Sequence, residues 1–341
     1  MTENKRTPVS SLGKVAFIEK LISPFRTDGM PEPDDAAVIA RDGYSELVSV
    51  ATMLEGIDFD LTYFPLQHLG YKSVVKAVSN IYAMNGTPQY LTVGIGLSAR
   101  FSVEDAEALY EGIRRGCGDY SVTLAGGNTS PSLTGLTIAL TAIGRADDDK
   151  VVRRSGAGLN DIVCVSGNFG AAYMGLQLLE REKRSVGGEG AVRPELEGHE
   201  YILERQLKPA ARADITEALN EAGIVPTAMI DVTSGLASAA LHICNSSDTG
   251  IRIYLDRIPI SSGTFAMAEE MGIDPVVAAL NGGDDFELLF TVPLNKHQEV
   301  LAMGGVDVIG HMVAASKGAA LTTPDGSEIT ITSPDFTSVE Q

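Results

Sequence analysis

The sequence predicts an α+β protein built from two α/β-sandwich domains, over residues 1–150 and 151–341. Two observations support this fold class. Segments with strand and helix character alternate in both parts of the chain, and a polar stretch rich in Gly, Ser and Asn separates them at residues 145–160. A length of 341 residues allows each part its own core. A doubly wound nucleotide-binding fold fits less well, because no GxGxxG motif follows an early strand.

The first part of the chain is expected to run strand, helix, strand, helix, strand, strand. Its first helix carries Val74, Val75, Val78 and Ile81 at helical spacing. Its second helix follows a serine with an aspartate three positions later, which is typical of a capped N-terminus. We expect helices at 71–84 and 103–117, strands at 46–54, 90–98, 121–125 and 136–143, and a turn-rich loop at 126–135.

The second part repeats the alternation of strands and helices. A segment rich in Gly, Glu and Pro interrupts it at residues 186–198 and is expected to be a mobile loop. We expect strands at 161–166, 227–232, 251–255, 286–292 and 306–310, and helices at 170–180, 215–222 and 234–244.

Composition excludes several classes of function. The 45 acidic and 26 basic residues give a formal net charge of −19, which argues against a nucleic-acid binder. No apolar run is long enough for a membrane-spanning helix, and the polar N-terminus predicts a cytoplasmic protein. Cys117, Cys164 and Cys244 lie far apart in apolar contexts, so we interpret them as reduced core thiols. The five histidines lack metal-ligand spacing and are interpreted as isolated side chains.

Four polar clusters are candidates for chemistry. Acidic pairs at strand ends suit Mg²⁺, and Gly-Gly lets backbone amides approach a phosphate. Taken alone, the first three clusters are better explained as ordinary turns. The last cluster has two interpretations: an acid at a strand end and the amides of a helix starting near Thr233 or Ser234 together face a ligand, or Ser234 is an ordinary helix N-cap. The clusters are Asp34-Asp35, residues 125–130, residues 281–287 and residues 227–236.

Read together, the clusters resemble the motifs of the thiamine-monophosphate kinase family, part of the aminoimidazole ribonucleotide synthetase superfamily. The resemblance covers nearly the whole chain. The family patterns GDDAAV, STDxxVEGxHF, LGYKxxxxSDxAAMGxP, GGDTT, RSGAxxGD, DxSDGL and GGEDYELLF correspond to residues 33–38, 49–59, 69–88, 126–130, 154–161, 231–236 and 282–290.

The resemblance implies phosphoryl transfer from ATP to thiamine monophosphate, giving thiamine diphosphate, with ATP and Mg²⁺ as cofactors. It also implies a homodimer whose N-terminal domains pair into a barrel-like core. No catalytic side chain is assigned. The implied site residues are Asp34, Asp35 and Asp231 for metal, Gly126, Gly127, Asn128, Arg154 and Thr233 for nucleotide, and Asp58 and Asp284 for substrate.

The chain departs from the family pattern mainly at the metal-binding positions. An aspartate of the pattern is replaced at each of Ala51, Asn80, Asn128 and Ser234, so about four negative charges are lost from the metal site. Asp58 stands for a histidine and Asp284 for a glutamate. Two hypotheses follow: a kinase impaired by a reduced metal set, or a paralogue that binds nucleotide or a phosphorylated metabolite with little or no turnover, holding anions through Lys72, Arg154 and backbone amides.

Overall fold

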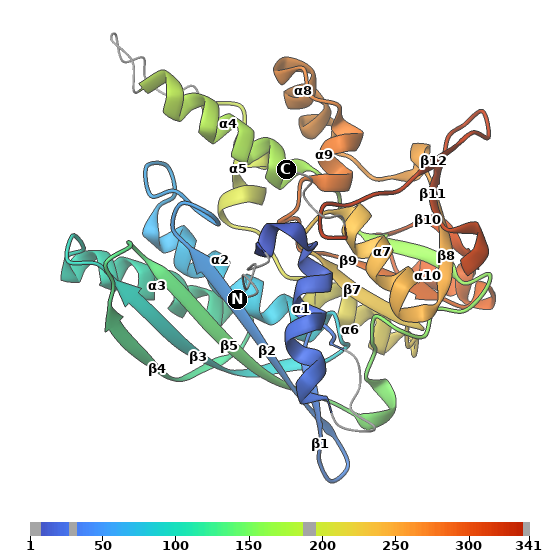
Figure 1. The fold of residues 1–341 in the computed structure, drawn as a ribbon, viewed down its shortest axis with the longest axis horizontal. Helices are drawn as coiled ribbons and strands as arrows, with labels where there is room; N and C mark the ends of the chain where they lie inside the picture. Colours follow the sequence, from blue (N-terminus) through green and yellow to red (C-terminus); the bar gives the residue numbers. More distant parts are fainter. Residues whose placement is uncertain (1–7, 27–32, 187–195, 337–341) are drawn as a thin grey trace, which may run out of the picture.

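The computed structural model describes residues 8–26, 33–186 and 196–336 and contains two β-sheets side by side (Figure 1). The first part of the chain supplies the first sheet and its helices. Its elements are α1 (Lys14–Ile22), β1 (Ala37–Ala40), β2 (Ser45–Leu54), α2 (Leu66–Tyr82), β3 (Thr87–Leu97), α3 (Val103–Asp119), β4 (Thr123–Pro131) and β5 (Thr137–Ala146).

The N-terminal sheet has the order β1-β2-β5-β3-β4, with only β3 and β4 parallel. Alternate residues of β2, such as Leu47 and Met53, are buried beneath α2 and α3, as the period of two in a half-buried strand requires. The opposite face of this sheet carries exposed apolar side chains, among them Val50 and Tyr90. The structure describes one chain, and its N-terminal sheet is open rather than closed into a barrel.

The second part of the chain forms the larger sheet, in the order β12-β11-β8-β10-β6-β9-β7. All pairs in it are antiparallel except β8 with β11. Its elements are β6 (Ile162–Ser166), α4 (Ala171–Val186), α5 (Glu200–Leu207), α6 (Ala213–Glu221), β7 (Ala228–Val232), α7 (Leu236–Ser247), β8 (Thr249–Tyr254), α8 (Ser262–Met271), α9 (Pro275–Asn281), β9 (Glu287–Val292), α10 (His297–Ala302), β10 (Val306–Ala314), β11 (Ala319–Thr322) and β12 (Glu328–Thr330).

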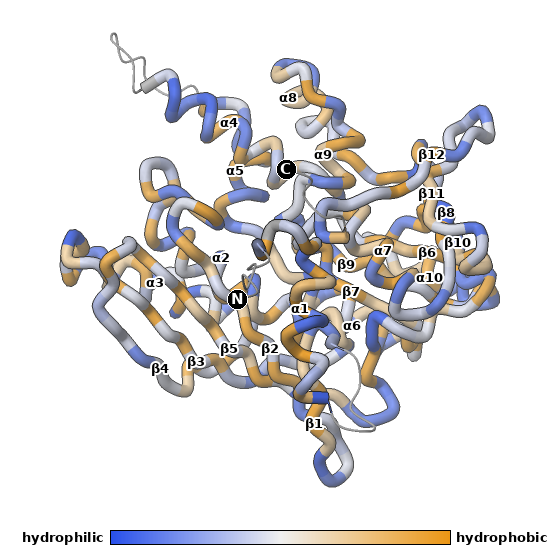
Figure 2. Tube along the Cα trace, viewed as in Figure 1, coloured by the Kyte–Doolittle hydropathy of each residue, from blue (hydrophilic) through white to orange (hydrophobic). Residues whose placement is uncertain are grey.

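Both faces of the central strands of this sheet are covered. Every residue of β6, β7 and β9 is buried. Val165 and Ile230 face the cluster that includes α7, whereas Cys164 and Met229 face the cluster that includes α6 and α10. Strands that are buried on both faces have mostly apolar sequences without alternation, and the sequences of β6, β7 and β9 are of this kind. Figure 2 shows the same apolar concentration along the strands of both sheets.

The expected helices and strands are present, with shifts of a few residues at their ends. Ser102 and Asp105 form the capping box of α3, in which each side chain accepts a hydrogen bond from the other's backbone N–H. The three cysteines are buried and free, as expected. Most of the loop expected at 186–198 lies outside the described residues.

One prediction about the first sheet is wrong. The segment expected to be a turn-rich loop at 126–135 continues β4 as far as Pro131, in parallel register with β3. Glycine favours turns, but at Gly127 it permits close strand pairing, because an added Cβ would lie 2.5 Å from the carbonyl oxygen of Val93. The short elements α1, β1, α5, α8, α9, α10, β11 and β12 were not anticipated.

Candidate active site

Asp231 occupies a buried position near the end of β7. It pairs with Leu288 of β9 and is 4% exposed. The chain then turns sharply into α7 through Gly235, whose φ of +89° is suited to glycine and whose added Cβ would lie 2.3 Å from the carbonyl oxygen of Leu280. Gly235 is the N-cap, so the alternative interpretation of Ser234 as the helix cap is wrong.

Arg154 brings Asp34 and Asp35 together with Asp231. Its guanidinium donates a hydrogen bond to Asp35 Oδ1, and its Nε lies 3.8 Å from Asp34 Oδ1. The backbone N–H of Arg154 also donates to the Asp34 carboxylate at 3.3 Å. Asp231 lies close enough to Arg154 for each to influence the other's charge. Three carboxylates therefore share one guanidinium.

The electrostatics of this cluster indicate a shortage of positive charge. Burial, with help from Asp35, raises the pKa of Asp34 to about 6 and that of Asp231 to about 7. Burial also raises the pKa of Asp35, although Arg154 opposes the change. Asp35 Oδ2 and Asp231 Oδ2 are buried and accept no hydrogen bond. Each of these oxygens is a potential ligand for a cation.

The residues present fit a magnesium ion shared with a nucleotide better than one held by the protein alone. Within the described ranges, no three Asp, Glu, His or Cys side chains are arranged to enclose a metal ion. Asp35 Oδ2 and Asp231 Oδ2 nevertheless offer two carboxylate oxygens. Mg²⁺ commonly takes one or two carboxylates and completes its six ligands with water and phosphate oxygens.

A cavity of about 250 Å³, here called the Asp231 cavity, opens beside this cluster. Helix α1 closes one side, where the backbone N–H of Val15 donates to the carbonyl of Asp335 at 3.1 Å. His242 also lines the cavity, although the sequence interpretation treated it as isolated. The four-residue spacing of Ser234, Ser238 and His242 was the available signal. The lining residues predicted from the sequence are Asp34, Arg154, Asp231, Thr233 and Ser234.

A second cavity, of about 450 Å³ and here called the Asp284 cavity, shares the lining residue Thr233 with the first. Three aromatic and four acidic side chains contribute to its wall. The two predicted substrate residues, Asp58 and Asp284, are among them. The aromatic residues are Phe59, Tyr63 and Phe64, and the acidic residues are Asp58, Asp60, Glu180 and Asp284.

Most acids of the Asp284 cavity have a lysine partner. Asp284 lies 2.9 Å from Lys72 Nζ, and Asp58 lies 2.8 Å from Lys76 Nζ. The two lysines are one turn apart on α2. Hydrogen bonding from Lys183 lowers the pKa of Asp60 to about 2. Glu180 instead accepts a hydrogen bond from the hydroxyl of Tyr63 at 2.7 Å.

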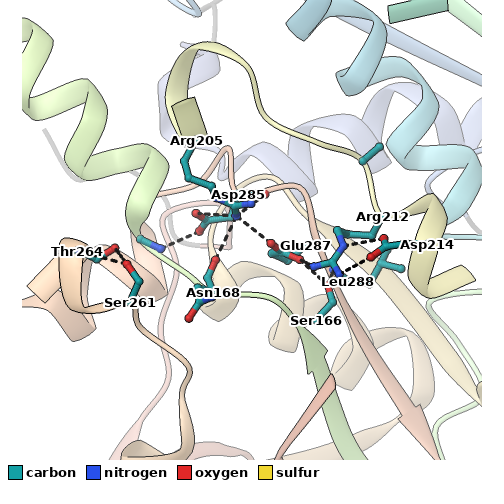
Figure 3. A network of polar contacts seen from close by, with 12 residues as sticks. Ser166, Asn168, Arg205, Arg212, Asp214, Ser261, Thr264, Asp285, Glu287 and Leu288 are labelled. Carbon is teal, nitrogen blue, oxygen red and sulfur yellow. Dashed lines mark hydrogen bonds and ion pairs between the residues drawn. The ribbon is translucent and has the colours of Figure 1, made fainter. Parts of the chain in front are cut away.

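A buried polar network holds the loop that carries Asp284 (Figure 3). Asp285 Oδ2 accepts a hydrogen bond from the backbone N–H of Gly170 at 3.0 Å. Arg205 donates to the carbonyl of Asp285 at 3.0 Å and to Glu287 Oε1 at 2.9 Å. Burial raises the pKa of Asp285 to about 7. This network joins the start of α4 to α5 and β9.

The amino-acid sequence of this chain is similar to those of several known proteins. Residues 33–146 match the family described as AIR synthase related protein, N-terminal domain. Thiamine-monophosphate kinase of Aquifex aeolicus is 31% identical over 272 residues, which cover 79% of this chain and 83% of that protein. The Bacillus subtilis thiamine-monophosphate kinase is 32% identical over 269 residues, covering 79% of this chain and 78% of the relative.

The chain belongs to the thiamine-monophosphate kinase family.

Solved structures agree with this assignment to the thiamine-monophosphate kinase family. The complex of AaThiL with AMPPCP and TMP superposes with a TM-score of 0.82 at 26% identity, over 95% of this chain and 97% of that one. A hydrogenase maturation protein HypE in complex with ATP, at 18% identity and a TM-score of 0.68, shares the fold. No described helix is long and apolar enough to cross a membrane.

Several positions of the thiamine-monophosphate kinase pattern lie away from the two cavities. Gly126, Gly127 and Asn128 are on β4, at the opposite edge of the sheet from β1, so about four strand spacings, or roughly 19 Å, separate these edges. Ala51 is buried on the face of β2 that packs under α2 and lines neither cavity. Asn80 is on α2 and also lines neither.

Proposed function

We propose that this chain transfers the γ-phosphoryl group of ATP to thiamine monophosphate, giving thiamine diphosphate, at a rate reduced by its missing metal ligands. The observation that carries the proposal is that two cavities of different chemical character share Thr233 as a lining residue. One cavity contains carboxylates and a guanidinium suited to metal-bound phosphates. The other has three aromatic side chains and four acids, three of which are paired with lysines, and its remaining free carboxylate oxygens suit a cationic ring. The similarity to AaThiL, whose structure contains AMPPCP and TMP, supports this arrangement.

The chain's own residues supply positioning and charge. Arg154 presents a guanidinium to phosphate oxygens, and Asp35 holds it in place. Asp34, Asp35 and Asp231 would hold Mg²⁺, which when bound neutralises charge developing on the transferred phosphoryl group. The acids and aromatic rings of the Asp284 cavity complement the thiazolium and aminopyrimidine rings of thiamine monophosphate. The acceptor phosphate would then point toward Thr233.

A second candidate function is nucleotide binding with little turnover. The neutral residues Ala51, Asn80, Asn128 and Ser234 favour it, because each replaces a carboxylate of the family pattern. Calorimetric titration of ATP with and without Mg²⁺, together with chromatographic assay of thiamine diphosphate, separates the two. Metal-dependent binding with product formation supports the kinase. Binding indifferent to Mg²⁺, without product at high enzyme concentration, supports the binding protein.

Adding back one of the missing carboxylates tests whether the loss of metal ligands lowers kcat. Ser234 lines the Asp231 cavity, so Ser234→Asp adds an oxygen ligand beside Asp231 and should raise kcat about tenfold or more. Ser262→Asp is the matched control, because it adds the same charge at an exposed position at the start of α8 that lines neither cavity. An unchanged kcat in folded Ser234→Asp would contradict the metal-loss explanation.

We also propose that the protein is a homodimer in which β4 of one subunit brings Gly126, Gly127 and Asn128 to its partner's site. All nine residues of β4 are exposed, and on the same sheet Val50 is 67% exposed and Tyr90 48%. Val50→Lys should shift the sedimentation velocity from dimer to monomer and lower activity. Val103→Lys is the control, because Val103 is equally exposed, at 69%, at the start of α3. A wild-type monomer would contradict this proposal.

A further inference from the structure

Lys72 is a buried charged side chain whose role the proposed function leaves open. It lies on α2 and is 1% exposed. Its ammonium contacts Asp284 Oδ2 at 2.9 Å, the carbonyl of Gln206 at 2.9 Å and the Gln206 side-chain oxygen at 3.2 Å. The face of Phe64 lies 5.5 Å from the ammonium. A lysine has three N–H donors, so all three are engaged.

The same contacts fix Asp284 in an unusual conformation. Its φ is +56°, and Gly283 and Phe286 beside it also have positive φ values, of +78° and +54°. Such backbone conformations persist only when surrounding contacts impose them, and they concentrate at functional sites. Here the backbone N–H of Asp284 donates to the carbonyl of Thr233 at 2.9 Å, while Lys72 holds the carboxylate.

One oxygen of Asp284 remains available to a ligand. Oδ2 is paired with Lys72, whereas Oδ1 accepts no hydrogen bond from the described residues. The side chain is 35% exposed and lines the Asp284 cavity. Asp58 differs, because its two oxygens are taken by Lys76 and by the backbone N–H of Leu54. Asp284 is therefore the better-placed acceptor of these two predicted substrate residues.

We propose that Lys72 is a positioning residue for substrate recognition, which acts by orienting Asp284 Oδ1 toward a cationic, N–H-bearing heterocycle in the Asp284 cavity. This inference rests on the proposed function, because it concerns the same cavity. It also gives a reason for the aspartate at position 284: the pairing with Lys72 fixes a side chain one methylene shorter than the glutamate of the family pattern.

A purely structural role for Lys72 makes a different prediction. Lys72 joins α2 to Gln206 at the end of α5, so it also links the two parts of the chain. Losing only that link would reduce stability and affect both substrates alike. Loss of Asp284 positioning would affect thiamine monophosphate selectively, because Asp284 lines the Asp284 cavity and not the Asp231 cavity.

The test compares full-length Lys72→Met, Asp284→Asn and the double variant. KM for each substrate and kcat are measured at pH 7.5, with calorimetric binding of thiamine monophosphate. Each single variant should raise KM and Kd for thiamine monophosphate about tenfold or more, with KM for ATP changed less than twofold. The double variant should be no worse than Asp284→Asn, because Lys72 acts through Asp284. Lys208→Met, which removes a lysine stacked on Tyr71 of α2, is the control and should leave every value unchanged.

The possible outcomes are distinct. Equal losses toward ATP and thiamine monophosphate, or additive losses in the double variant, would overturn the positioning role and leave the proposed function intact. A wild-type chain that does not bind thiamine monophosphate would overturn both. If Lys72→Met does not fold, Lys72→Gln keeps a hydrogen-bond donor without the charge, and the same selective rise in KM is expected. Wild-type KM values in folded Lys72→Gln would also contradict the inference.

Discussion

At the scale of single residues, buried carboxylates outnumber the cations that face them. Arg154 is shared by Asp34, Asp35 and Asp231, whereas Asp284 is the one carboxylate paired with Lys72 among the described residues. Because three carboxylates share Arg154, some of their oxygens stay free to bind a metal ion. Because Lys72 pairs with a single carboxylate, it can fix the orientation of Asp284 for substrate recognition. The same residue types therefore serve different purposes in the two cavities.

Replacing Arg154 with Met should be strongly destabilising. The Asp35 side chain is 1% exposed and would lose the guanidinium that pairs with it. Leaving a buried charge unpaired costs about 3–5 kcal/mol of unfolding free energy. Urea denaturation at pH 7.5 measures the loss of unfolding free energy in Arg154→Met. Arg145→Met is the control, since Arg145 is exposed on β5 and should stay within about 0.5 kcal/mol of wild type. A loss below about 1 kcal/mol in Arg154→Met would contradict the role assigned to this pair.

The sequence predicted individual site residues better than their partners. The family resemblance marked Asp34, Arg154, Asp231, Thr233 and Ser234, which come from distant segments and line one cavity. The partners of Lys72 and the position of His242 were not predictable, because each depends on packing between segments over 130 residues apart or on a helix face that the motifs do not mark. The metal and nucleotide roles of these residues stay predictions.

At the scale of secondary structure, α2 and α3 approach closely enough to require glycine. An added Cβ at Gly112 would lie 1.9 Å from the carbonyl oxygen of Gln67, and one at Gly70 would lie 2.1 Å from that of Leu109. These contacts are with backbone atoms, which cannot swing aside. The two glycines therefore set the distance between the helices that support the N-terminal sheet.

Gly112→Ala should destabilise the protein even though alanine favours helix. Helix propensity alone would gain about 1 kcal/mol, whereas overpacking against backbone costs about 1–3 kcal/mol or more. Gly118→Ala is the matched control, because it lies on the same helix with open space around its Cβ position and should gain about 0.5–1 kcal/mol. Thermal unfolding of both variants gives the comparison. Equal shifts in Tm would show that the helices can move apart at little cost.

Long periodic elements were the ones that the sequence predicted correctly. Helices α2 and α3 carry a clear apolar stripe or a capping box, and β6, β7 and β9 are continuous apolar runs. The prediction failed for β4, where glycine and serine favour a turn by composition but pairing with β3 decides the structure. Short helices such as α9 have too few residues for a periodic signal.

At the scale of the whole molecule, buried acids make stability depend on pH in an unusual direction. Asp34, Asp231 and Asp285 have folded pKa values of about 6, 7 and 7, against about 4 in an unfolded chain. Between pH 4 and 7 the folded protein keeps protons that the unfolded chain releases, so the free energy of unfolding falls as pH rises. Asp60, with its pKa lowered to about 2, loses its stabilising effect only below about pH 4.

We therefore expect the urea midpoint to be higher at pH 5.5 than at pH 7.5, by an amount equivalent to about 1–3 kcal/mol. Adding Mg²⁺ at pH 7.5 should recover part of the loss, because a cation bound by Asp35 and Asp231 replaces the missing protons. Asp285→Asn should reduce the pH dependence and keep the Mg²⁺ effect, since position 285 lies outside the metal cluster. Burial also lowers the pKa values of His68, His242 and His311, and their effect on stability has the opposite sign over this range. A midpoint that rises from pH 5.5 to 7.5 would contradict the expectation that the three carboxyl groups outweigh the histidines.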